Sequence, residues 1–97
     1  MIYHVVPAAD WNRQTLASVY APATFEKEGF IHCCSKAQLA GVLERYYNSQ
    51  PGLLLLHLDE SKLEHQLMYE KASNDELFPH LYGRINRDAV ISIEKIS

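Results

Sequence analysis

The run from Leu53 to Leu58 restricts the fold of this chain more than any other feature of its sequence. Five of its six residues are leucine, and the sixth is His57. An apolar run of this length is typical of a strand that is buried on both faces, so we expect it at the centre of a sheet. It is far shorter than the ~20 residues that a bilayer span needs, and the sequence therefore predicts no contact with a membrane.

The length of the chain, 97 residues, predicts a single domain over residues 1–97. Its composition, 47% hydrophobic and 22% charged, is that of an ordinary globular protein and excludes disordered and collagen-like classes. A core of this size leaves stability marginal, and the sequence leaves the oligomeric state open.

The charge of the chain is slightly negative. Nine Lys and Arg residues stand against twelve Asp and Glu residues, for a formal charge of -3 and a pI of about 5.9. The basic residues are scattered, which disfavours binding to duplex nucleic acid. No signal-peptide pattern opens the sequence, and its two cysteines, Cys33 and Cys34, are neighbours that cannot form an unstrained bridge. We therefore expect free thiols and a cytoplasmic location.

Two helices are expected. Ser35 and Gln38 form a capping box, and an apolar stripe follows at helical spacing, comprising Leu39, Val42, Leu43, Tyr46 and Tyr47. A second, shorter helix is predicted to begin at Asp10 as its cap and to end before Pro22.

The remaining segments predict strands and loops. The strands are expected at Ile2–Val6, Phe30–Cys34, Leu53–Leu58, Leu67–Lys71 and Ala89–Ile96. The loops are a charged turn at Glu26–Gly29, a turn or short helix at Asp59–Glu64, a polar loop at Ala72–Glu76, and an aromatic loop at Leu77–Gly83 stiffened by Pro79. The predicted class is α+β, with a mixed or antiparallel sheet of five or six strands and two helices.

Strand alternation sorts the residues around His32. Phe30, His32 and Cys34 share one face, while Ile31 and Cys33 share the other, so we expect His32 and Cys34 to face a cleft. A nucleophilic pair of Cys34 with His32 or His80 stays open, although the sequence identifies no third group to orient it. Zinc is disfavoured because the paired spacing of structural sites is absent, and no metal is predicted.

The other titratable candidates have two interpretations each. The segment around His80, with Tyr82 and the following Arg84, either presents ligand-binding groups or closes one end of the core, and the residues alone favour neither. Glu70 is either a site carboxylate or a solvated strand residue. The other three histidines are expected to be structural: His4 and His57 as satisfied, packed side chains and His65 as a solvated one.

Five elements of the sequence together resemble a known family over nearly the whole chain. They are Gly29-Phe30-Ile31-His32, Arg45-Tyr46-Tyr47, the run Leu53–Leu58 with Asp59, Tyr69-Glu70, and Leu77-Phe78-Pro79-His80-Leu81-Tyr82-Gly83. The last is the most specific. The family is the small bacterial and plant domain of unknown function 952, which is similar in structure to ADP-ribosyltransferases, especially the branch that includes RNA 2′-phosphotransferases. The resemblance implies a split, mostly antiparallel sheet with an NAD-sized cleft.

The resemblance also implies a site. Its catalytic residues would be His32, Glu70 and His80, and its NAD-binding residues His32, Cys34, Tyr82 and Arg84. His32 would hydrogen-bond the ribose, and Tyr82 would supply an aromatic face. Glu70 would engage the 2′-hydroxyl and stabilise positive charge, and His80 or Arg84 would pair with phosphate. Cys34 departs from the family, where serine is usual. His4 stands where the family often has another polar residue or lysine.

The function implied is binding of NAD or a related small-molecule nucleotide and transfer of ADP-ribose to an RNA end or a protein. The alternative is a non-catalytic nucleotide-binding or protein-interaction module that keeps the cleft without turnover. A third reading is a domain whose histidines are only structural.

Overall fold

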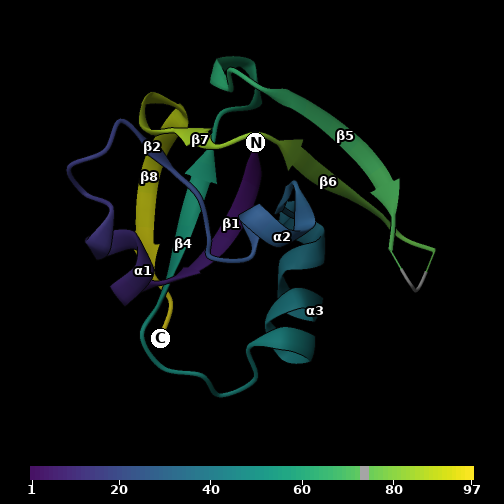
Figure 1. Ribbon diagram of the computed structural model, residues 1–97. Coiled ribbons are helices and arrows are strands. Elements are labelled where there is room, and N and C mark those ends of the chain that lie inside the picture. Colours follow the sequence, from purple (N-terminus) through teal and green to yellow (C-terminus); the bar gives the residue numbers. More distant parts are fainter. Residues whose placement is uncertain (73–74) are drawn as a thin grey trace.

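The leucine run forms the central strand of a three-stranded antiparallel sheet in the computed structural model, which describes residues 1–72 and 75–97 (Figure 1). This strand, β4 (Leu53–Leu58), pairs with β1 (Ile2–Pro7) on one side and with β8 (Val90–Lys95) on the other. Leu56 and Leu58 face the main core, whereas Leu53 and Leu55 belong to a second apolar cluster. Both faces of β4 are therefore buried, as the sequence predicts.

A second three-stranded sheet has β6 (Leu77–Tyr82) at its centre, between β3 (Ile31–His32) and β5 (Gln66–Lys71). All its pairings are antiparallel, and β5 and β6 form a long hairpin at one side of the molecule (Figure 1). The prediction of a loop at Leu77–Gly83 is therefore wrong. Pro79 does not interrupt the strand, because its carbonyl still accepts a hydrogen bond from the Cys33 backbone N–H at 3.0 Å.

The remaining pairing is a two-stranded sheet of β2 (Val19–Tyr20) and β7 (Ile85–Asn86). Within the described residues the strands thus form three small sheets in place of the single sheet of five or six strands that we expected. A backbone bridge between Tyr3 and Cys34 joins the two larger ones, through N–H···O bonds of 2.8 and 2.9 Å. The α+β class is confirmed.

Helix α3 (Lys36–Tyr46) has the capping box that its sequence predicts. The Gln38 backbone N–H donates to Ser35 Oγ at 3.3 Å, and the Ser35 N–H donates to Gln38 Oε1 at 2.9 Å. Leu39 and Leu43 pack against the second cluster, at the face of the sheet that holds Leu55. The helix therefore lies beside β1 and contributes its other residues to the space between the two larger sheets (Figure 1).

The shorter helices differ from expectation. Helix α1 (Ala8–Arg13) follows directly on Pro7, so Asp10 lies inside its first turn instead of capping it. It ends well before Pro22, because the chain then enters β2 and pairs with β7. A four-residue helix, α2 (Phe25–Glu28), replaces the charged turn and ends at Gly29, whose φ of 81° suits glycine.

Other boundaries are shifted by a few residues. Regular pairing of the second strand is limited to β3, and Cys34 joins it only through the bridge to Tyr3. Two 3₁₀ turns, η1 (Glu60–Lys62) and η2 (Arg87–Ala89), flank the central sheet. The loop expected at Ala72–Glu76 includes residues 73–74, which lie outside the described residues. Among the described residues, none of the helices has the length and apolarity to cross a bilayer.

Candidate functional site

A pocket of about 700 Å³ lies between the two larger sheets, where β1, the β3–Cys34 segment and β6 meet helix α3. Its size is in the range of small-molecule binding sites. Three of the five histidines line it: His4 from β1, His32 from β3 and His80 from β6. The backbone bridge between Tyr3 and Cys34 holds the first two strands together at this point, so the pocket has a rigid base.

His80 presents a fixed tautomer to the pocket. Its Nδ1 donates a hydrogen bond to Glu70 Oε1 at 2.8 Å, and the Tyr82 hydroxyl donates to the same oxygen at 2.5 Å. An ionised carboxylate can only accept, so in the neutral ring Nδ1 carries the proton and Nε2 keeps its lone pair. Phe30 stacks on the ring with centroids 4.3 Å apart, and the side chain is buried. His80 therefore offers the pocket a hydrogen-bond acceptor, Nε2, on a ring whose orientation is fixed.

Glu70 is stabilised as a carboxylate in this arrangement. Two hydrogen bonds lower the pKa of Glu70 below its usual value, and the bond from Tyr82 has a larger effect than the bond from His80. The residue does not line the pocket and reaches it only through the His80 ring. Glu70 is thus placed to orient His80.

His4 is a second acceptor, deeper in the pocket. Its Nδ1 donates to the backbone carbonyl of His32 at 2.7 Å, and burial lowers the pKa of His4 to about 4. The ring is therefore neutral near pH 7, with its lone pair on Nε2. That Nε2 is buried without a hydrogen-bond partner, and so is the hydroxyl of Tyr20, whose ring lies 6.1 Å from that of His4.

Unpartnered buried polar atoms are rare, because each costs about 1–3 kcal/mol of lost solvation. Here both Tyr20 and His4 line the same pocket. A satisfied core histidine was expected at position 4; the ring is buried, but Nε2 is not satisfied. The buried end of the pocket thus holds two polar atoms whose hydrogen bonds the described residues do not supply.

His32 stands at the mouth of the pocket, with 59% of its side chain exposed. Its ring lies 5.3 Å from that of His80 in an edge-to-face arrangement, and its Nε2 is 3.2 Å from Glu28 Oε1. Two imidazoles, each beside a carboxylate, therefore share one opening. Such neighbours can exchange or hold protons for a bound ligand.

The two cysteines are free and buried. Cys34 lines the pocket, while Cys33 touches both the pocket and the main core, and Ile31 is wholly in the core. Burial raises the pKa of the Cys34 thiol to about 11 and raises that of Cys33 further. Both thiols are protonated near pH 7, so the structure offers no activated nucleophile at Cys34.

The remaining predicted residues lie outside the lining. Tyr82 has 40% of its surface exposed and contacts Glu70. Arg84 donates to Glu26 at 2.8 Å and lies over the ring of Phe25 at 5.0 Å. The structure thus brings His32, Cys34 and His80 together in the pocket lining. Glu70 lies behind His80, outside the lining, and Tyr82 and Arg84 lie on the outer surface.

Other residues of the lining had no signal in the sequence. Glu28 reaches the pocket because α2 turns it beside His32, and Asp10 does so because α1 starts earlier than its capping pattern suggests. Tyr46 and Tyr47 stand out in the sequence as members of a helical stripe and of the family motif Arg45-Tyr46-Tyr47, but not as pocket residues. In residues 1–72 and 75–97, no group of three or more potential ligands could hold a metal ion.

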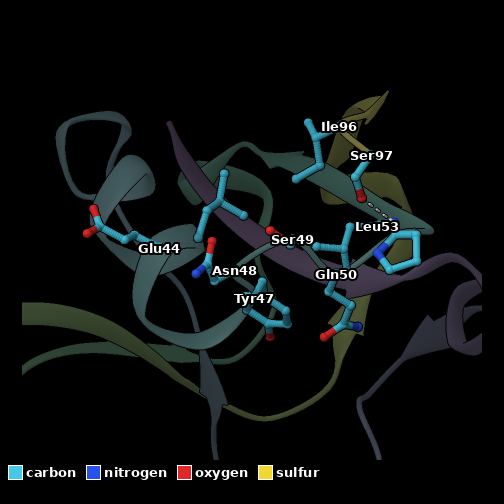
Figure 2. A pocket seen from close by; sticks show the side chains of 10 residues that line it. Glu44, Tyr47, Asn48, Ser49, Gln50, Leu53, Ile96 and Ser97 are labelled. Atoms are coloured by element: carbon cyan, nitrogen blue, oxygen red, sulfur yellow. Dashed lines mark hydrogen bonds between the residues drawn. The ribbon is translucent and has the colours of Figure 1, made fainter.

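A second cavity of about 430 Å³ lies where the end of α3 meets the end of the chain (Figure 2). Glu44, Tyr47 and Asn48 line it from one side and Ser97 from the other, where Ser97 Oγ accepts a hydrogen bond from the Leu53 N–H at 3.0 Å. It contains neither histidine nor cysteine. The pocket of His4, His32 and His80, hereafter the histidine pocket, is therefore the candidate site.

Solved structures share this fold. A crystal structure of protein CC0527 from Caulobacter crescentus is 24% identical, with a TM-score of 0.89, and the match covers 99% of this chain and 85% of that one. A crystal structure of its double mutant, 23% identical, gives the same TM-score and coverage. A solution structure of CC0527 gives a TM-score of 0.84 over 99% of this chain and 84% of that one. At this identity the likeness concerns the fold alone.

Sequence comparison adds the family. None of the curated proteins matches the chain. The model of one family, described as "Protein of unknown function (DUF952)", matches residues 5–93, which include every residue of the histidine pocket except Tyr3 and His4. This chain therefore belongs to the DUF952 family of proteins of unknown function.

Proposed function

We propose that this protein is an ADP-ribosyltransferase-like domain that binds NAD, or a related nucleotide, in the histidine pocket and transfers its ADP-ribose. The supporting observation is the pair of fixed acceptors, because His4 and His80 each commit Nδ1 to a protein acceptor and keep Nε2 for a ligand. Ribose hydroxyls are donors that suit two such lone pairs.

The rest of the lining fits the chemistry of that transfer. When the bond between nicotinamide and ribose breaks, positive charge builds on the sugar while nicotinamide leaves with the bonding electrons. Glu28 lines the pocket and is the carboxylate that would face this charge, a role that the resemblance implied for Glu70. An acceptor hydroxyl that bonds to the sugar would pass its proton to Nε2 of His80.

The pocket favours one end of the nucleotide. Tyr47 and Phe78 supply aromatic surface for a nicotinamide ring, while Cys34 supplies a neutral thiol. No lysine or arginine is among the lining residues that the structure describes, so a pyrophosphate finds no basic partner inside. The pyrophosphate of a bound nucleotide would therefore extend out of the pocket through its mouth, beside His32.

The test is a titration followed by NMR. We expect NAD or ADP-ribose to shift the amide signals of His4, His32 and Cys34, and we expect slow release of nicotinamide in the presence of an RNA 2′-phosphate or a protein acceptor. His80→Ala should weaken binding at least about fivefold, whereas His65→Ala, which changes an exposed histidine outside the pocket, should not. Absence of shifts at millimolar NAD and ADP-ribose would overturn the proposal.

One observation favours the alternative of a non-catalytic nucleotide-binding module. The Cys34 thiol is neutral, and the strongest carboxylate–histidine contact, between Glu70 and His80, lies behind the pocket wall. Binding of NAD without release of nicotinamide, with each candidate acceptor supplied in turn, would establish that module and exclude the transferase.

A further inference from the structure

The lining of the histidine pocket carries acidic side chains but no lysine or arginine in the described parts of the chain. Its acidic members are Asp10 and Glu28. Asp10 is ion-paired with Arg13, a largely exposed side chain. The Glu28 carboxylate pairs with His32 Nε2 at 3.2 Å, and no lysine or arginine of the described residues lies within ion-pair distance of it. The pocket thus holds a carboxylate whose partner among the described residues is a histidine and not a permanent cation.

Aromatic rings line the same pocket. Four tyrosines and one phenylalanine line the pocket, namely Tyr3, Tyr20, Tyr46, Tyr47 and Phe78. The face of an aromatic ring carries partial negative charge and attracts a cation within about 6 Å of its centre. The aromatic rings and the carboxylate of Glu28 therefore both favour a cationic ligand.

The pocket also resists negative charge. Burial raises the pKa of the Cys34 thiol to about 11 and raises the pKa of the Tyr47 hydroxyl. Burial raises the pKa of the Tyr20 hydroxyl, and the negative charge of Asp10 raises it further. These three groups are thus held neutral, and an anionic ligand group beside them would meet the same penalty.

His4 indicates where a cation would lie. Burial lowers its pKa to about 4, which means that positive charge is unfavourable at the deepest point of the pocket. Glu28 and the exposed ring of His32 are at the outer side, where solvent and a carboxylate both stabilise positive charge. The favourable position is therefore beside Glu28.

We infer that the histidine pocket selects a small organic cation, of the N-substituted pyridinium or ammonium class, over uncharged and anionic counterparts of the same shape. The inference rests on the proposed function for placing the ligand in this pocket, and it adds the charge that the ligand carries. The unpartnered hydroxyl of Tyr20 can donate to the oxygen of a polar substituent, such as a carboxamide. The oxidised ring of NAD meets this description and the reduced ring does not.

The first experiment compares matched ligands by calorimetry or NMR. 1-Methylnicotinamide carries the positive charge, and nicotinamide is its uncharged counterpart. We expect the cation to bind at least about tenfold more tightly, which corresponds to about 1.4 kcal/mol, and we expect oxidised NAD to bind more tightly than its reduced form by a similar factor. Equal affinities within each pair would overturn the inference.

The second experiment changes the charge on the protein. Glu28→Gln removes this carboxylate with little change of shape, and it should reduce the preference for 1-methylnicotinamide to less than about threefold. Glu26→Gln is the matched control, because Glu26 lies on the same helix but is exposed, pairs with Arg84 and does not line the pocket. Circular dichroism of both variants checks that the fold is retained. An unchanged preference in Glu28→Gln would contradict the assignment of the cation to this carboxylate.

The outcomes separate this inference from the proposed function. If 1-methylnicotinamide binds more tightly than nicotinamide while NAD and ADP-ribose cause no shift, the charge selection stands and the nucleotide function falls. If oxidised and reduced NAD bind equally well, the nucleotide function stands and the charge selection falls. If none of these ligands binds, both are overturned.

Discussion

Glu70 and His80 are diagonal neighbours across the antiparallel pair of β5 and β6, and the His80 Nδ1–H donates to the carboxylate at 2.8 Å. Met68 is the residue directly opposite His80, so Glu70, two positions further along β5, lies on the same face. The strand register therefore fixes the tautomer of the imidazole, and through it the acceptor that the ligand meets.

This relationship predicts the effect of Glu70→Gln. A neutral amide oxygen is a weaker acceptor than a carboxylate, so the Nδ1 proton of His80 should be held less firmly and the tautomer with the proton on Nε2 should gain population. ¹⁵N NMR of the ring nitrogens measures this change. Glu94→Gln is the control, since Glu94 forms a separate pair with His57 at 3.0 Å. Identical ¹⁵N signals of the His80 ring in wild type and Glu70→Gln would show that the contact does not set the proton position.

Tyr82→Phe tests the other partner of the same carboxylate. The hydroxyl of Tyr82 makes the largest contribution to the lowered pKa of Glu70, ahead of the bond from His80. Its removal should raise the pKa of Glu70 toward the usual value, as measured by ¹³C NMR of the side-chain carboxyl carbon. Because a lowered pKa in the folded state stabilises the protein above the unfolded pKa and is lost as pH falls, the variant should also lose less stability on acidification. A Glu70 titration unchanged in the variant would rule out this hydrogen bond.

The buried His4 predicts a pH dependence of stability. Its folded pKa is about 4 and its ordinary value is 6.5, so the unfolded chain binds more protons between these values. Stability should therefore be complete above pH 6.5 and fall as the pH drops toward 4, by about 3 kcal/mol from this residue at most. Urea unfolding at pH 7 and pH 5 measures the loss, which should be smaller in His4→Gln. A loss of the same size in both proteins would mean that His4 is not the group responsible.

Packing on β4 predicts a graded series of substitutions. Leu56 is fully buried in the main core, so Leu56→Ala should lower the free energy of unfolding by about 2–5 kcal/mol. Leu43 on α3 is only partly buried, and Leu43→Ala should cost less. Leu16→Ala changes a fully exposed side chain and should have no measurable effect. Denaturant unfolding of the three variants gives the order directly, and a reversed order would contradict the assigned core.

The parts of the fold that could be predicted are those that neighbouring residues determine. The capping box at Ser35 and the leucine run of β4 are local patterns, and both elements have the predicted bounds to within a residue. Strand β6 could not be found in this way. One of its two partners, β3, is distant in sequence, and Pro79 is locally typical of a loop, although its carbonyl still accepts from the Cys33 N–H.

The candidate site, too, could be predicted only where neighbouring residues determine it. Alternation predicted that Ile31 and Cys33 would be in the core and that His32 and Cys34 would border a cleft. Ile31, His32 and Cys34 lie as predicted, whereas Cys33 borders both the core and the pocket. The unpartnered Nε2 of His4 depends on three segments that meet around it, and Glu28 depends on a helix too short to have a clear signature. No single stretch of sequence contains that information.

The last prediction compares Arg84, which lies outside the pocket lining, with His80, which belongs to it. The resemblance to ADP-ribosyltransferases implies that either residue pairs with phosphate, and this stays a prediction. Arg84, however, is held by Glu26 at 2.8 Å and lies on the ring of Phe25, outside the pocket lining. We expect Arg84→Gln to change the affinity for NAD less than about twofold, while His80→Ala weakens it at least about fivefold. Calorimetric titration of both variants measures the two factors at once. A large loss in Arg84→Gln would mean that the phosphates leave the mouth of the pocket toward α2 and displace Glu26 from its arginine.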